Sequence, residues 1–242
     1  MTLFLSSIAP AVIIMFIVFR HDTIKEPKSM LAKAFFGGML SIPIALSIAI
    51  PLGWLTNSFS PGFARSFYDA FFCAGIPEEI GKWIIFYWLI QRAKDFDQYY
   101  DGILYAIFIS MGFALVENLL YVYGTAVDKG TSAGLGVAAV RAILSVPGHM
   151  LFAIPMGYFL SLQKFEEGSL ALQHKILSLA IPIVLHGTFD FILMSTGAYS
   201  KINPALSGLL VLGFVAFDIW MWRFALGKIK AHITKDKSNL NA

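Results

Sequence analysis

Charged residues are scarce in this chain, and cysteine is almost absent. Only 14% of the 242 residues are Asp, Glu, Lys or Arg, whereas about a quarter are charged in an ordinary soluble domain. Since 57% of the residues are hydrophobic and fall in long runs, this shortage excludes a water-soluble globular protein. Cys73 is the single cysteine, which excludes an internal disulfide and a thiolate zinc cluster. No connection could hold a second folded domain, so we expect one membrane-embedded domain over residues 1–242.

Seven hydrophobic runs are long enough to cross a bilayer, for which a helix needs about 20 residues. They cover about residues 3–19, 34–55, 67–91, 103–123, 137–162, 176–196 and 205–227. The runs lack the alternating pattern of a membrane barrel. We therefore predict an all-α fold, a polytopic bundle of about seven transmembrane helices in the cell membrane. The first run lacks a preceding basic residue and a convincing cleavage site, so we expect it to stay as a helix.

Basic residues are distributed unequally between the two sides of a seven-span arrangement. Only Arg65, Lys129 and Lys201 fall on one side. The other side holds Arg20, Lys25, Lys28, Lys33, Arg92, Lys94, Lys164, Lys175, Arg223, Lys228, Lys230, Lys235 and Lys237. Positive residues stay cytoplasmic, which predicts an outside amino terminus and a cytoplasmic carboxyl terminus. We expect the basic tail to contact anionic lipid headgroups rather than nucleic acid, and His21, His174 and His232 to be solvated.

Several ionisable or polar side chains interrupt the spans, where each charge costs roughly 2.5 to 3.5 kcal/mol. They are Glu78, Glu79 and Lys82 in the third span, Glu117 and Asn118 in the fourth, Arg141 and His149 in the fifth, and His186 and Asp190 in the sixth. At 1.5 Å per residue, four of these (Glu78, Glu117, His149 and His186) fall in the middle or outer half of the membrane. A shared cavity would let them satisfy one another. We expect a polar pocket open toward the outside.

Carboxylates and neutral imidazoles are ligands that suit zinc, which keeps a position for water in catalytic sites. A free carboxylate beside them could act as a general base. Spacings of four residues place Glu78 and Lys82 on one helix face, and likewise His186 and Asp190. Pro77, just before Glu78, could open the backbone there. The chemistry indicated is hydrolysis of a peptide bond in a membrane-anchored substrate.

The supporting polar residues also have structural interpretations. Lys82 is expected to be a charge partner of Glu78 or Glu79. Asp190 could orient His186 or hydrogen-bond across helices. Asn118 could stabilise an oxyanion or form an interhelical hydrogen bond. For Arg141, snorkelling from the outer end of its span to the membrane interface is the expected explanation.

Four motifs in order resemble those of the PrsW intramembrane proteases: Glu78-Glu79-x-x-Lys82, Phe113-x-x-x-Glu117-Asn118, His149 with Gly157, and His186-x-x-x-Asp190. The resemblance covers about residues 67–195. The motifs are similar, more distantly, to those of the CAAX prenyl endopeptidase and bacteriocin-processing membrane proteases, whose first motif also begins with paired glutamates.

The resemblance implies an intramembrane endopeptidase that cuts the extracytoplasmic portion of an anti-sigma factor. It implies that Glu78 activates the attacking water and that Glu79 supports it. Glu117, His149 and His186 would hold a metal, zinc being the expected cofactor, or polarise the scissile carbonyl. The CAAX branch has a histidine where this chain has Glu117, so a metal-free glutamate mechanism also stays open.

Two other classes of function fit some of the residues. Buried Glu, His and Lys on kinked helices also build the ion relays of transporters. The chain lacks the internal repeat typical of a transporter, and the four ordered motifs favour the protease. A catalytically silent scaffold would not need so many costly polar groups at one depth.

Overall fold

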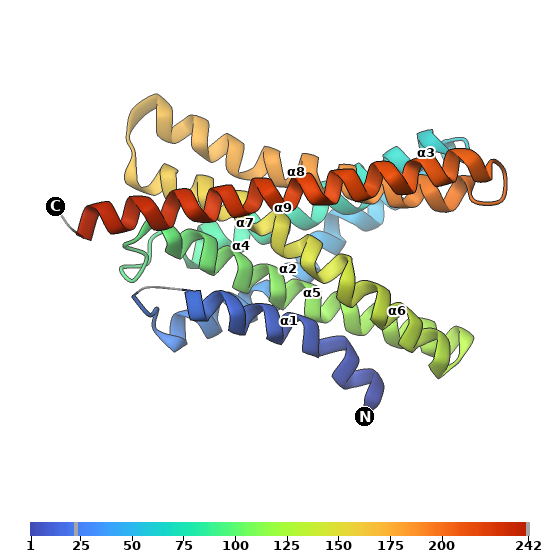
Figure 1. The fold of residues 1–242 in the computed structure, drawn as a ribbon, viewed down its shortest axis with the longest axis horizontal. Helices are drawn as coiled ribbons and strands as arrows, with labels where there is room; N and C mark the ends of the chain where they lie inside the picture. The colour runs from blue at the N-terminus through green and yellow to red at the C-terminus, as the bar shows by residue number, and fades with distance from the viewer. Residues whose placement is uncertain (22–23, 241–242) are drawn as a thin grey trace.

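The computed structural model is a bundle of helices that lie side by side (Figure 1). The structure describes residues 1–21 and 24–240, and these contain no strand. Six helical segments are long and apolar enough to cross a membrane: Thr2–His21, Lys28–Ser58, Tyr99–Lys129, Thr131–Phe165, Gly168–Tyr199 and Pro204–Asn239. The predicted all-α class and the multi-pass membrane protein are confirmed. The single domain stays a prediction, and its residues 22, 23, 241 and 242 lie outside the described residues.

The third predicted span, 67–91, is a helix in three parts. These are α3 (Phe63–Tyr68), the π-helical turn η2 (Asp69–Gly75) and α4 (Ile76–Leu89). The predicted span 137–162 is also divided, because Leu144 separates two helices. The remaining elements are α1 (Thr2–His21), α2 (Lys28–Gly53), η1 (Thr56–Ser58), α5 (Tyr99–Lys129), α6 (Thr131–Ile143), α7 (Ser145–Phe165), α8 (Gly168–Tyr199) and α9 (Pro204–Leu240).

The connections alternate between the two ends of the bundle. In Figure 1 the end of α1, the start of α2 and the α4–α5 and α7–α8 connections lie at the end of the bundle where α9 ends. The α2–α3, α5–α6 and α8–α9 connections lie at the opposite end. This alternation is what seven membrane crossings require, if α3, η2 and α4 together form one crossing and α6 and α7 together form another.

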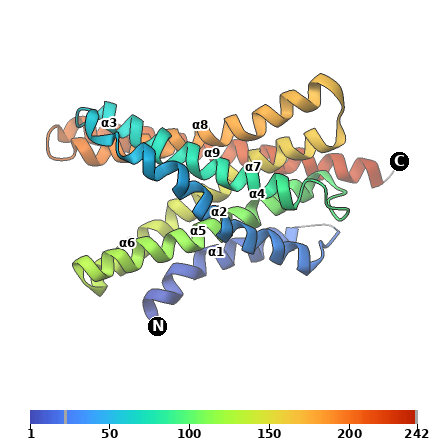
Figure 2. The same cartoon turned by 180° about the vertical axis from the view of Figure 1, so that it is seen from behind.

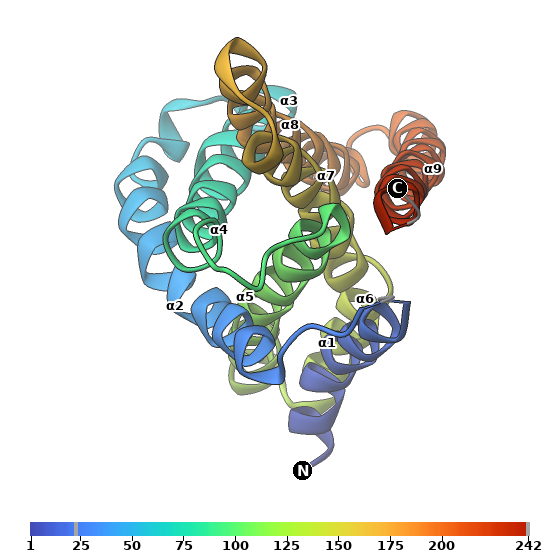
Figure 3. The ribbon, with the colours of Figure 1, turned by 90° about the vertical axis from the view of Figure 1, so that its left-hand side faces the viewer.

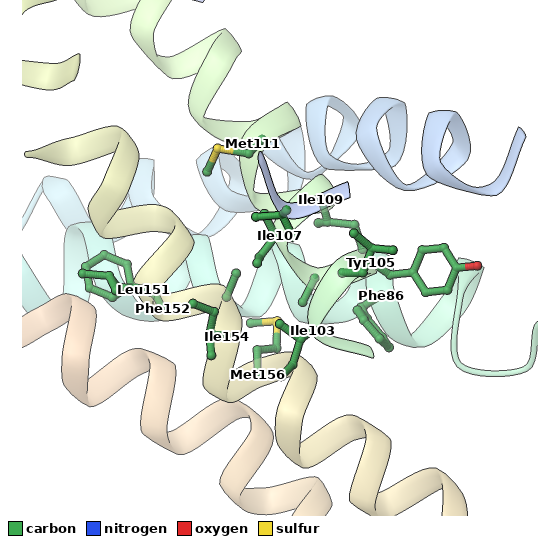
Figure 4. Close-up of a cluster of buried hydrophobic side chains, with 14 of the residues drawn as sticks. Phe86, Ile103, Tyr105, Ile107, Ile109, Met111, Leu151, Phe152, Ile154 and Met156 are labelled. Atoms are coloured by element: carbon green, nitrogen blue, oxygen red, sulfur yellow. The ribbon is translucent and has the colours of Figure 1, made fainter. Parts of the chain in front are cut away.

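Helix α5 is the central element of the bundle (Figure 3). In its most apolar stretch 72% of the residues are buried inside the protein, against 17% in α1 and in α9. The core packs the buried side chains of α5, such as Ile103 and Ile107, against those of α7, such as Phe152 and Ile154 (Figure 4). The outer helices instead present apolar side chains outward, which suits contact with lipid.

Glycine allows the central helices to approach closely. A Cβ atom on Gly157 of α7 would meet the backbone of Gly102 in α5, and one on Gly38 of α2 would meet the carbonyl of Ile109 in α5. In both contacts a small residue lets the backbones of two membrane helices approach closely. They hold α2 and α7 against the helix that carries Glu117.

Helix α9 continues beyond the predicted span 205–227, through Leu240. The backbone N–H groups of Tyr99 and Tyr100 donate to the Asp236 carboxylate, each at 2.8 Å, so the tail caps the start of α5. His232 is 1% exposed and stacks on the Tyr158 ring at 4.1 Å. The prediction that His232 is solvated is therefore wrong. His174 is also mostly covered, at 2.6 Å from Glu166.

Candidate active site

Four helices bring the predicted polar residues together. Glu78 and Glu79 lie in the first turn of α4, Glu117 in α5, His149 in α7 and His186 in α8. The rings of the two histidines lie 5.5 Å apart. The shared cavity expected from their depths is present, whereas their catalytic roles stay predictions.

A backbone irregularity sets the direction of the two glutamates. Pro77 has no N–H and its ring would clash with the carbonyl four residues earlier in a regular helix. The π-helical turn η2 directly precedes α4 and widens the helix at that point. Gly75 at the end of η2 lies against the backbone of Gly187, where a Cβ would come within 3.1 Å of the Gly187 nitrogen. This contact places the start of α4 beside His186.

A buried network links α4 to both histidines. Lys82 donates to Glu79 Oε1 at 2.7 Å and lies 3.6 Å from Glu78 Oε2, so the predicted charge partner contacts both glutamates. His186 Nδ1 donates to the same Glu79 oxygen at 2.8 Å. Lys82 also lies 3.2 Å from His149 Nδ1. Glu79 is fully buried and Lys82 is 1% exposed, so each charge depends on the other for its stability.

Glu117 is held by two donors. His149 Nε2 donates to Glu117 Oε2 at 2.8 Å, and Arg141 Nη2 donates to the same oxygen at 2.6 Å. Arg141 Nε donates to the side-chain oxygen of Asn118 at 2.5 Å. The Arg141 guanidinium also lies 4.4 Å from the centre of the Tyr121 ring. The Arg141 side chain is only 11% exposed, so the snorkelling prediction is wrong.

The other two supporting residues have separate contacts. The Asn118 side-chain nitrogen donates to the Ser7 carbonyl of α1 at 3.1 Å, which is the interhelical hydrogen bond that the sequence left open. Asp190 Oδ2 lies 3.4 Å from His186 Nε2 on the same helix. Of the two interpretations of Asp190, this contact supports the orientation of His186.

A polar cavity of about 140 Å³ joins these groups. Its lining includes Glu78, Glu117, His149, His186, Asp190 and Arg141, together with Tyr121 and Ser145. Since a water molecule in the liquid occupies about 30 Å³, a few waters fit this space. The arrangement can therefore keep water against carboxylates and imidazoles inside a membrane bundle.

Three polar lining residues were not predicted to belong to the site: Ser145 and Tyr121 were not singled out, and Arg141 was assigned to the membrane interface. A spacing signal was present for each of them. Arg141 and Ser145 precede His149 at intervals of four, and Tyr121 follows Glu117 by four. Residues four apart share a helix face. A search of the helix face around His149 and Glu117, in steps of four residues, would have found all three residues.

Three of the residues could hold a metal ion. Ligand atoms of Glu78, His149 and His186 all lie within 4.8 Å of one another. Glu78 Oε2 is buried and accepts no hydrogen bond from the described residues. Glu79 holds Nδ1 of His186 and leaves Nε2 for the cavity, which is the carboxylate–histidine arrangement of metal sites. A metal held by His149 would replace its contact with Glu117 or with Lys82. The donor set therefore fits a zinc-like ion.

Comparisons with known proteins identify the family of the chain. Residues 26–221 match the family described as PrsW family intramembrane metalloprotease. "Protease PrsW" of Clostridioides difficile (strain 630) is 32% identical over 97% of this chain and 93% of its own length. "Protease PrsW" of Bacillus subtilis (strain 168) is 32% identical over 93% of each chain. No solved structure matches the chain. The chain belongs to the PrsW family of intramembrane proteases.

Proposed function

We propose that the chain hydrolyses a peptide bond of a membrane-anchored protein in the cavity between α4, α5, α7 and α8, with Glu78 as general base. One observation supports this role most directly. Glu78 Oε2 is buried, accepts no hydrogen bond from the described residues and lines a cavity that can hold water. Glu117 is less suited to the role because Arg141 and His149 already occupy its Oε2. Family membership favours this hydrolase over the transporter and scaffold alternatives.

In the proposed mechanism Glu78 accepts the proton of the attacking water and later returns it to the leaving amine. Glu79 fixes the ring of His186 through Nδ1, so that Nε2 faces Glu78 at 3.9 Å. Lys82 balances the charge of Glu79 during this exchange. His149 and His186 would hold the metal together with Glu117, as the family resemblance implies, and not with Glu78, although the ligand atoms of Glu78 and the two histidines lie within 4.8 Å of one another. When bound, such an ion polarises the scissile carbonyl and makes water more acidic.

The experiment is cleavage of single-span substrates by purified protein, with bound metal measured on the same samples. We compare wild type with Glu78→Gln, His186→Ala and the control Glu167→Gln, whose site is exposed at the start of α8. If Glu78 is the general base, Glu78→Gln should lose cleavage activity and keep the bound metal. His186→Ala should lose both the activity and the metal. Loss of metal in Glu78→Gln would instead make Glu78 a ligand. Full cleavage after chelation would favour the glutamate mechanism without metal.

We propose that the substrate is an anti-sigma factor cut in its extracytoplasmic portion. The family resemblance and the position of the cavity support this substrate. Glu78 lies near the middle of the crossing from Phe63 to Leu89, and His186 lies in the half of α8 that leads to the α8–α9 connection, at the end of the bundle opposite most of the basic residues. Co-expression with each single-span anti-sigma factor of the same organism should yield a fragment with wild type and none with Glu78→Gln. A fragment that persists with Glu78→Gln would exclude this protein as the cause.

This substrate requires an outside amino terminus and a cytoplasmic carboxyl terminus, which we propose from the basic residues at one end. Reporter fusions after Asn239 test the orientation. A fluorescent protein that folds only in the cytoplasm should be bright there, and alkaline phosphatase should be inactive. The reverse pattern would place the active site toward the cytoplasm.

A further inference from the structure

A second cavity lies on the other side of Glu78 and Glu117. It has a volume of about 180 Å³ and is enclosed by α2, η2, α4 and α5. Its apolar lining comes from Ile42, Ala45, Leu46, Ala49, Phe113 and Leu120. Among the described residues, the two glutamates that both cavities share are the only charged side chains in its lining.

The cavity arises from the way α2 and α5 diverge. In their first halves the two helices are in close contact, where Gly38 meets the carbonyl of Ile109 and Gly112 meets the carbonyl of Phe35. Figure 2 shows α2 running toward α3 while α5 runs toward α6, so the helices separate toward their carboxyl ends. The small side chains of Ala45 and Ala49 leave this space open.

The cavity opens toward lipid. Leu46 on α2 is 45% exposed and Leu120 on α5 is 58% exposed, and both line the space. Exposed apolar side chains on membrane-spanning helices face the hydrocarbon. A membrane-anchored chain can therefore reach the two glutamates from the bilayer between α2 and α5, while the polar cavity on their other side has room for water.

We propose that this α2–α5 cavity is the subsite that receives an apolar side chain of a residue next to the scissile bond. The proposal rests on the hydrolysis assigned above to Glu78. Both cavities share Glu78, Glu117 and Tyr121, so a side chain seated in the apolar cavity holds its own backbone against the carboxylates. An apolar protein cavity of about 150 Å³ accepts a ligand as large as benzene. The subsite therefore suits Leu, Met or Phe and disfavours Asp or Glu beside the two carboxylates.

The first test narrows the subsite. Ala49 is half-buried and lines the cavity, so Ala49→Phe fills part of it. Substrates carry Ala, Leu, Phe or Asp at each position flanking the scissile bond. Filling the cavity should lower kcat/KM for the preferred Leu or Phe substrate by about 10- to 200-fold relative to the Ala substrate, the range for a methylene-sized mismatch in an apolar pocket. Ala32→Phe is the control, since Ala32 is exposed on the same helix near its other end.

The second test needs no mutation and decides the case if Ala49→Phe does not fold. Cys73 lines the cavity and is the sole cysteine, so N-ethylmaleimide adds bulk there alone. Alkylation should lower cleavage of the Leu substrate more than that of the Ala substrate, and Cys73→Ala should be insensitive.

The outcomes separate the subsite from the hydrolysis. Equal loss for all substrates, or no loss, in both tests would overturn the subsite and leave the protease intact. A wild-type protein that cleaves none of the substrates would overturn the proposed function and this inference with it.

Discussion

Replacing Arg141 by methionine should lower kcat/KM by about 10- to 150-fold. Arg141 Nη2 lies 2.6 Å from Glu117 Oε2, and the Arg141 side chain is 11% exposed. A hydrogen bond to a charged group contributes about 1.5 to 3 kcal/mol, and about 1.4 kcal/mol corresponds to a factor of ten. Loss of this contact leaves the Glu117 carboxylate with His149 as its remaining donor on that oxygen.

Because Arg141 also contacts Asn118, we expect arginine and lysine at position 141 to differ in the activity they support. Arg141 reaches Glu117 and Asn118 with two nitrogens of one guanidinium, and a lysine ammonium cannot reproduce this fork. Arg141→Lys should therefore lose part of the activity although it keeps the charge. Arg223→Met is the control, because Arg223 is an exposed arginine of α9.

The assay is cleavage of one single-span substrate by the single variants Arg141→Met and Glu117→Gln and by the double variant. If Arg141 acts through Glu117, the double variant should lose little more than the worse single variant, which corresponds to a coupling energy of at least about 1.5 kcal/mol. Additive losses, or an Arg141→Met protein as active as Arg223→Met, would refute the reasoning.

Three further predictions concern stability, measured as the thermal midpoint in one detergent. Gly157→Val should destabilise the protein by about 1 to 3 kcal/mol, because a Cβ at this position would meet backbone atoms of α5. Gly208→Val is the control and should leave the midpoint unchanged, since a Cβ there would have nothing within 4 Å. Equal midpoints for the two variants would contradict this prediction. Lys82→Met should cost about 3 to 5 kcal/mol, because the fully buried Glu79 carboxylate loses its lysine partner and keeps only its contact with His186. A stable variant would show that the carboxylate is protonated. Asp236→Ala should cost about 0.5 to 2 kcal/mol of stability, because the start of α5 loses a helix cap. Lys237→Ala is the control and should keep the wild-type midpoint. No difference between the two variants would mean that the tail does not stabilise α5.

Much of the fold could be predicted from the sequence, because the thickness of the bilayer sets the length of each membrane-spanning segment independently of the others. Any apolar run of about 20 residues must form a helix in lipid, so the spans did not depend on their neighbours. The interruption of 67–91 was not predicted as a π-helix. Pro77 indicated an opened backbone there, but the form of the opening depends on the contact of Gly75 with Gly187 in α8.

The candidate site could also be predicted from the sequence, for a different reason. A charge in the membrane is costly wherever it falls, so Glu78, Glu117, His149 and His186 stood out, and helical rise placed them at a common depth. Arg141 was misinterpreted because its position near the end of a span allows snorkelling as readily as an ion pair. The bend between α6 and α7 at Leu144 brings it to Glu117.

The sequence by itself determined the helical class, the membrane-spanning segments and the main ionisable residues of the site, since these depend on local composition and on the cost of burying charge. Tertiary structure alone decided the partners: His186 with Glu79, Glu117 with Arg141, and Asp236 with the start of α5. It also decided the apolar cavity, which exists because α2 and α5 touch at Gly38 and then diverge. Such contacts join residues far apart in the chain, and their geometry depends on how all the helices pack at once.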